Sequence, residues 1–326
     1  MEGKEQATMN FGRRVLAFHY VWYGTPWGPA GQWRGWKSDA YDADRVYGGR
    51  RNITAAHYPL DGVFDSLSED TVRRQLREAE SAGIDGFMIS WWGIGDYSDR
   101  VLEVFMRLAP VDFVTIYYET AMTFRLRDES REKAVNRIYE DLRTLLNRYR
   151  DHERWIRVNG KPLFVLYIVG NYTVDEWQQV KERLREGGDE VFFLGDTYDP
   201  DYLAVMDGLH TYNPIGITLS GRDLLATYRQ VAERCHAQGA LFAATVCPGY
   251  DDRKIRTPGL YVAREDGGYY ERTWRAGRES GADWALICSY NEWYEGSEIE
   301  PSIEFGTKYL HLTAQNARAF RAAAAS

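Results

Sequence analysis

The sequence predicts an α/β protein folded as a single (β/α)8 TIM barrel, and three observations support this prediction. Apolar, β-branched and aromatic runs recur eight times along the 326 residues. Amphipathic stretches with helical spacing separate most of these runs, as in a parallel sheet that is covered by helices. No Pro-, Gly- or Ser-rich linker and no internal repeat divides the chain, so we expect one domain over residues 1–326.

The expected elements alternate in barrel order along the chain. The link after the fifth strand, residues 198–206, is too short for a full helix. The expected strands span residues 15–23, 85–92, 112–119, 162–169, 191–196, 207–213, 241–247 and 283–290. The expected helices span residues 69–81, 98–108, 131–149, 174–185, 222–238, 269–279 and 304–324.

A long, aromatic-rich loop, residues 24–68, follows the first expected strand. A loop of this length is uncommon in a compact domain unless it serves as a lid or a binding wall. We expect it to form one wall of a cleft in which Trp27, Trp33 or Trp36 stacks on a ligand. The alternative is a loop that is packed down by its own rings.

Four glutamates cluster directly after the eighth expected strand. Glu292, Glu295, Glu298 and Glu300 fall within nine residues. Barrel proteins keep their active sites at this end of the strands. Cleavage of a glycosidic bond needs two carboxyls, one to protonate the leaving oxygen and one to act as base or nucleophile. We therefore expect Glu292 and Glu295 to be the catalytic pair, the alternative being an acidic, solvated loop or a helix N-terminus, and Glu298 and Glu300 to be surface or supporting groups.

Aromatic, amide and carboxyl side chains gather at the other expected strand ends. Because these ends meet at one mouth of a barrel, we expect their side chains to line one site. Such a mouth suits an uncharged, polyhydroxylated ligand, whereas a phosphate favours a Gly-rich turn and clustered Lys or Arg. The expected ligand-binding residues are Tyr20, Trp22, Tyr23, Trp91, Trp92, Glu119, Tyr212, Tyr250, Asn291 and Trp293.

Composition argues against several other classes of protein. The net charge of −8, without a long Lys or Arg run, favours neither a nucleic acid nor a membrane partner. The six histidines and three cysteines lack metal-ligand spacing, so we expect no metal and no cofactor. A GxSxG elbow of a serine hydrolase is also missing. Because residues 1–10 carry no apolar segment, the expected location is cytoplasmic.

Seven groups of short motifs occur in order along most of the chain. They are Phe18–Pro26, Ala82–Ile84 with Ser90–Trp92, Lys161–Phe164, Asp207–Tyr212, Pro248–Arg256, Gly268–Glu271 and Asn291–Glu300. Together they resemble glycoside hydrolase family 99, the endo-α-mannosidase family. Motifs that share one order are a far more specific signal than any one of them alone.

The resemblance implies a (β/α)8 barrel and a metal-independent, retaining glycosidase that cleaves inside the α-mannosidic chains of an oligosaccharide or polysaccharide. It also implies that Glu292 is the base. This glutamate takes the proton of the sugar's own 2-hydroxyl, which attacks the anomeric carbon and forms a 1,2-anhydro sugar. By the same resemblance Glu295 is the acid that protonates the departing oxygen. Both groups then only move protons.

Some positions depart from the family pattern. The family tends to carry Glu-Pro-Tyr where Glu119-Thr120-Ala121 stands, His at Tyr294 and Gln at Glu298. A carboxylate at Glu298 adds a negative charge that would favour protonation of its carboxyl neighbours.

Two alternatives remain at this point. One is a double-displacement glycosidase that uses Glu292 with Glu119 or Asp196. The other is a non-catalytic carbohydrate-binding or glycan-assembly protein on the same fold.

Overall fold

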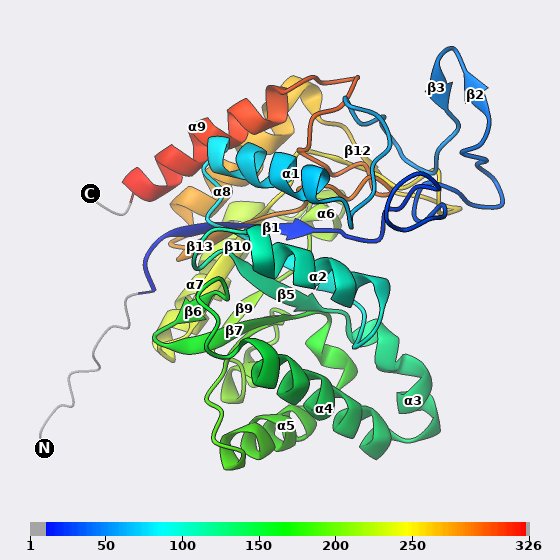
Figure 1. The fold of residues 1–326 in the computed structure, drawn as a ribbon. Coiled ribbons are helices and arrows are strands. Elements are labelled where there is room, and N and C mark those ends of the chain that lie inside the picture. The colour runs from blue at the N-terminus through cyan, green and yellow to red at the C-terminus, as the bar shows by residue number, and fades with distance from the viewer. Residues whose placement is uncertain (1–10, 324–326) are drawn as a thin grey trace, which may run out of the picture.

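The computed structural model describes residues 11–323, and its centre is a closed barrel of parallel strands (Figure 1). The ring closes because β1 pairs with both β4 and β13, and β5 pairs with β7. A short strand, β6 (Arg157–Val158), lies antiparallel to β7. The eight barrel strands are β1 (Arg14–His19), β4 (Gly86–Trp91), β5 (Val114–Tyr118), β7 (Lys161–Leu166), β8 (Phe192–Asp196), β9 (Gly208–His210), β10 (Leu241–Val246) and β13 (Trp284–Ile287).

Alternating side chains of each strand fill two different cores. Leu16 and Phe18 belong to the cluster inside the barrel, whereas Val15 and Ala17 pack with the helices outside it. This two-sided burial follows from the period of two in a strand. It also explains why the strands are near-continuous apolar runs rather than alternating ones.

Helices cover the outside of the barrel, as expected, and four of them begin at a side-chain cap. The oxygens of Asp96, Ser130, Thr173 and Asp223 accept hydrogen bonds from the first turns of α2, α4, α5 and α7. The helices are α1 (Glu69–Ser81), α2 (Tyr97–Leu108), α3 (Phe124–Glu129), α4 (Arg131–Tyr149), α5 (Val174–Glu186), α6 (Ile215–Leu219), α7 (Leu224–Ala237), α8 (Gly268–Glu279) and α9 (Lys308–Ala322). Within residues 11–323, no helix combines the length and the apolarity that a membrane crossing requires.

The prediction missed two short helices and extended the last one. The helices α3 and α6 have six and five residues, too few for a helical period to show in the sequence. The last helix begins at Lys308, and its predicted end at residue 324 lies outside the described residues. The link after β8 holds a 3₁₀ helix, Pro200–Ala204, in place of a full helix.

The loop of residues 24–68 packs against the segment that follows β13. The backbone nitrogens of Ala56 and Leu60 donate to the carbonyls of Trp293 and Pro301, both at 2.9 Å. Its hairpin, β2 (Val46–Tyr47) with β3 (Arg50–Arg51), stands out from the rest of the molecule (Figure 1). The loop and the glutamate segment therefore support each other.

Glu300 joins this segment to α1 through a buried network. Its side chain accepts hydrogen bonds from Arg74 at 2.9 Å, Gln75 at 2.9 Å and the indole of Trp293 at 3.0 Å. The carboxylate is buried, so removal of its side chain would leave the buried donors of Gln75 and Trp293 without an acceptor, while Arg74 keeps its pair with Glu78.

We expect Glu300→Ala to lower the free energy of unfolding by about 3 kcal/mol, because the buried donors of Gln75 and Trp293 lose their acceptor. Urea denaturation measures the effect. Glu129→Ala is the matched control, because Glu129 forms a solvent-exposed ion pair with Arg125. Such pairs contribute less than about 1 kcal/mol to the free energy of unfolding. Equal losses in the two variants would contradict a structural role for the Glu300 network.

Candidate active site

Glu292 and Glu295 lie directly after β13, at the carboxyl end of the barrel. Both are buried, with exposed fractions of 2% and 8%. Glu292 accepts a hydrogen bond from the backbone nitrogen of Tyr294 at 3.1 Å. Glu295 is held at both oxygens, by the hydroxyl of Tyr212 at 2.8 Å and the guanidinium of Arg256 at 2.9 Å. The two carboxyls thus share one short segment but have different surroundings.

Burial, and after it the negative charge of Glu295, raises the pKa of Glu292 well above its ordinary value. A base with a raised pKa takes a proton more strongly once it is ionised. The arrangement therefore suits Glu292 for proton abstraction.

A third carboxyl, Glu119, lies at the end of β5. The hydroxyl of Ser90 donates to it at 2.6 Å, and the indole of Trp92 donates to Ser90 at 3.0 Å. Burial, against the opposing effect of that Ser90 bond, raises the pKa of Glu119 to about 8, with Asp196 and Glu295 adding to the shift. Glu119 is therefore protonated at neutral pH and has a proton to donate.

Asp196, at the end of β8, accepts hydrogen bonds from residues that follow three other strands or lie at their ends. It accepts hydrogen bonds from the backbone nitrogens of Ile168 and Tyr212, at 3.1 and 3.0 Å, and from the hydroxyl of Tyr117 at 3.3 Å. Burial raises its pKa to about 6 despite these three donors. Both of its oxygens are thus occupied by protein groups.

Aromatic rings gather beside these carboxyls. Trp22 lies 4.7 Å from Tyr20, 6.2 Å from Trp92 and 5.7 Å from Tyr294, measured between ring centroids, and is stacked on the last. Burial and then the charge of Glu292 raise the pKa of Tyr20, so its hydroxyl remains a donor. Trp92 is 37% exposed and offers an open ring surface.

Tyr250 belongs to β11 (Tyr250–Asp251), which pairs with β12 (Tyr261–Val262). Its hydroxyl accepts a hydrogen bond from Arg256 at 3.0 Å and donates to Asp252 at 3.3 Å. Arg256 also donates to Asp252 at 2.5 Å. Tyr250 therefore contacts the group that holds Glu295.

Four expected ligand-binding residues are instead fully buried and bonded within the protein. The indole of Trp91 donates to Asp99 of α2 at 3.1 Å, on the outer side of the barrel. The difference arises because consecutive residues of a strand point to opposite faces, and a strand end alone does not fix which face is inward. The other three are Tyr23, Asn291 and Trp293.

Hydrogen bonds tie the glutamate segment to the end of the first strand, and they involve Tyr23, Asn291 and Trp293. The amide of Asn291 bonds both backbone groups of Tyr20, at 2.6 and 2.8 Å. The hydroxyl of Tyr23 donates to the carbonyl of Asn291 at 3.2 Å and accepts from the backbone nitrogen of Trp293 at 3.2 Å. Their expected contact with a ligand stays a prediction.

Two residues of the site were missed from the sequence. Arg256 lies on a loop after β10 rather than at a strand end, and Tyr294 stands between the two glutamates. The signal for Arg256 was its place in the motif Pro248–Arg256. Its contact with Glu295 depends on how that loop folds back.

Only part of the aromatic loop is free to meet a ligand. Trp36 is fully buried and its indole donates to the carbonyl of Phe64 at 2.8 Å. Trp27 is 60% exposed, with the Arg51 guanidinium 4.6 Å from its ring centroid. Trp33 packs edge-on against Trp27 at 5.1 Å.

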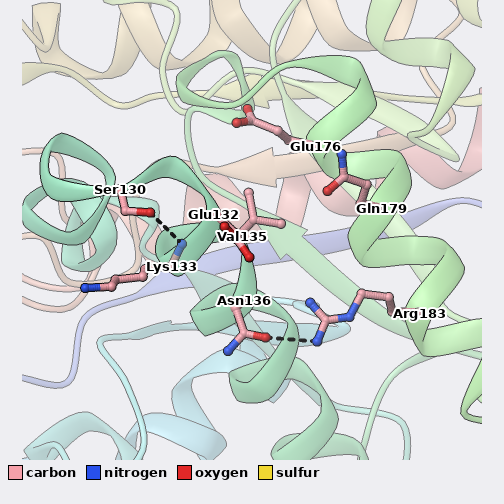
Figure 2. Close-up of a pocket in the computed structure, with 8 residues that line it drawn as sticks. All are labelled: Ser130, Glu132, Lys133, Val135, Asn136, Glu176, Gln179 and Arg183. Carbon is pink, nitrogen blue, oxygen red and sulfur yellow. Dashed lines mark hydrogen bonds between the residues drawn. The ribbon is translucent and has the colours of Figure 1, made fainter.

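A separate hollow of about 800 Å³ lies between α4 and α5 (Figure 2). Figure 2 shows Arg183 donating to Asn136 there, at 2.9 Å. Glu176 is occupied by the capping box of Thr173 and by Arg131. This hollow shares no residue with the strand-end group, and we do not assign the chemistry to it.

Among residues 11–323, no three His, Cys, Asp or Glu side chains are grouped as a metal site requires. The expectation that no cofactor takes part stays a prediction.

A closed (β/α)8 barrel with paired, buried carboxyls at its mouth is typical of glycoside hydrolases. The chain matches the model of Glycosyl hydrolase family 99 over residues 10–316, and it belongs to that family of hydrolases. The match agrees with the motifs found along the sequence.

Relatives of the chain are found among both curated proteins and solved structures. The glycoprotein endo-alpha-1,2-mannosidase of Rattus norvegicus is 25% identical over 320 residues, which cover 89% of this chain and 68% of the relative. A glycoprotein endo-alpha-1,2-mannosidase-like protein of Homo sapiens is 24% identical and covers 88% and 68%. The structure of the GH99 endo-alpha-mannosidase from Bacteroides thetaiotaomicron is similar with a TM-score of 0.78 and 26% identity, and the match covers 96% of this chain and 99% of that one.

We expect Trp27→Ala to weaken binding of an oligosaccharide substrate by about 1–3 kcal/mol, a magnitude borrowed from bases that stack on aromatic rings. Calorimetric titration measures this binding. Trp36→Ala is the contrasting variant and should lower the free energy of unfolding by about 3–5 kcal/mol. Unchanged affinity in Trp27→Ala would remove this side chain from the binding cleft.

Proposed function

We propose that this chain is a retaining, endo-acting hydrolase that cleaves α-mannosidic linkages through a 1,2-anhydro sugar. The observation that carries the proposal is the buried pair of Glu292 and Glu295 on one segment with unlike surroundings. The endo-mannosidase names of the relatives support the choice of sugar.

In the proposed reaction Glu292 takes the proton of the 2-hydroxyl, whose oxygen then attacks the anomeric carbon. Glu295 gives its proton to the departing oxygen as the glycosidic bond breaks. A water molecule then attacks the anomeric carbon and opens the anhydro ring. In this step Glu295 takes a proton from the water, and Glu292 returns a proton to the 2-oxygen. Two inversions at the anomeric carbon leave its configuration retained.

The surroundings of Glu119 and Asp196 favour this reaction over double displacement. One oxygen of Glu119 already accepts a hydrogen bond from the Ser90 hydroxyl at 2.6 Å, and Glu119 comes from β5 rather than from the segment that carries Glu292 and Glu295. Asp196 has its oxygens occupied by Ile168, Tyr117 and Tyr212. We therefore give Glu119 a role as a hydrogen-bond donor to the sugar.

The central test replaces each glutamate and varies the leaving group. Glu295→Gln should keep much of its activity on an aryl α-mannoside with a good leaving group, because such a group departs without protonation. Glu292→Gln should lose activity on both the aryl substrate and a mannan oligosaccharide. Steady-state kinetics on the two substrates measures these effects.

A 2-deoxy substrate supplies the control, because it lacks the oxygen that would attack the anomeric carbon. The unaltered enzyme should fail to cleave it. Rapid cleavage, together with a trapped glycosyl ester on a carboxylate, would refute participation and favour double displacement.

We expect Glu119→Gln to keep its activity at pH 7 within a few-fold, because an amide also donates. Above pH 8 the unaltered Glu119 ionises, loses its donor and adds a charge near Glu292 and Glu295, so activity should fall. The variant should not show this fall. A pH–rate profile measures it, and a loss of about 10⁴-fold or more at pH 7 would instead indicate a nucleophile.

A further inference from the structure

Arg264 is a buried arginine that contacts the backbone of the segment Glu292–Glu298, which carries both proposed catalytic glutamates. One of its terminal nitrogens, Nη2, donates to the carbonyl of Gly296 at 3.0 Å and to the carbonyl of Glu298 at 2.8 Å. The same nitrogen donates to the Glu298 carboxylate at 2.8 Å. Gly296 directly follows Glu295, so this arginine fixes the chain one residue beyond the proposed acid.

The peptide group that joins Glu295 to Gly296 is fixed as well. The carbonyl of Glu295 accepts a hydrogen bond from the backbone nitrogen of Asp251 at 2.7 Å. Gly296 has a φ of +56°, and a Cβ there would lie 2.9 Å from Ala56. The two peptide groups after Glu295 are therefore each held by a hydrogen bond, one from Asp251 and one from Arg264.

Arg264 is itself held rigidly and is 8% exposed. Its guanidinium lies 4.5 Å from the ring centroid of Phe305 and 4.4 Å from that of Tyr309. A Cβ at Gly249 would lie 2.4 Å from its side chain, so the glycine leaves the room that it needs. A side chain packed in this way keeps one position.

Glu298 is the counter-ion of Arg264. Its side chain is fully buried, and His57 from the long loop contacts it at 2.8 Å. Burial favours the neutral acid, yet Arg264 and His57 hold the pKa of Glu298 below its ordinary value. The charge at this position thus has two local partners, and its expected effect on Glu292 and Glu295 stays a prediction.

We propose that Arg264, with Glu298 as its counter-ion, is a positioning residue that sets the direction of the Glu295 side chain. The proposal rests on the assignment of Glu295 as the acid. It explains why the chain carries a buried ion pair beside a segment that already contains two carboxyls. A displaced acid would hinder only the step in which the leaving group takes a proton.

The test is Arg264→Lys, assayed on a mannan oligosaccharide and on an aryl mannoside with a good leaving group. A lysine lacks the planar guanidinium that packs on Phe305 and Tyr309, so its ammonium is not held at the position of Nη2. We expect kcat on the oligosaccharide to fall about 10- to 100-fold with KM little changed, because small misplacements of a catalytic group have this effect. On the aryl substrate kcat should fall less than about 3-fold, because that leaving group needs no acid.

Arg272→Lys is the matched control, since Arg272 makes an exposed pair with Glu265 and does not contact the segment. It should behave like the unaltered enzyme on both substrates. Equal losses on the two substrates in Arg264→Lys, or no loss, overturn the proposal. If Glu295→Gln itself shows no preference between the substrates, the acid assignment fails, and this proposal fails with it.

A second measurement keeps the proposal testable where Arg264→Lys folds poorly. Glu298→Gln retains the shape and removes the charge, and it should show the same selective loss, below about 10-fold, with an unchanged circular dichroism spectrum. A hollow of about 230 Å³ opens beside Arg264, so millimolar guanidinium should also restore oligosaccharide cleavage in Arg264→Ala. An unselective loss in Glu298→Gln overturns the proposal, as does the absence of rescue in a folded Arg264→Ala.

Discussion

The amide of Asn291 makes the contact on which the mouth of the barrel depends. The β1–β13 ladder ends at Ala17 and Ile287, and beyond it Asn291 bonds both backbone groups of Tyr20. This pairing continues the contact between the first and last strands after their regular ladder stops. The segment with Glu292 and Glu295 follows Asn291 directly. Its position therefore depends on the contact that closes the barrel between the first and last strands.

Burial of several carboxyls in one place is unfavourable unless each has a partner or a proton. The structure solves this in different ways at different positions. Glu295 has a tyrosine and an arginine, Glu298 an arginine and a histidine, and Glu119 keeps its proton. Glu292 accepts a hydrogen bond from the backbone and has the strongly raised pKa that such an environment produces. Of these four carboxyls, the proposed base is thus the one with the fewest side-chain partners.

The barrel was predictable from the sequence because runs buried on both faces are long and recur eight times. The location of the glutamates at a strand end was predictable for the same reason. The roles of neighbouring residues were less accessible, as Trp91 and Trp92 illustrate. One is bonded to α2 and the other is exposed near Ser90, and this difference depends on the register of β4 within the barrel.

The buried contacts of Glu298 have a consequence for how sequences of this kind can change. A single exchange at residue 57, 264 or 298 leaves a buried charge or donor without its partner. The three positions come from widely separated parts of the chain, yet they form one electrostatic unit. We expect substitutions in such a unit to occur in pairs rather than singly. A relative with glutamine at position 298 should therefore also differ at position 57 or 264.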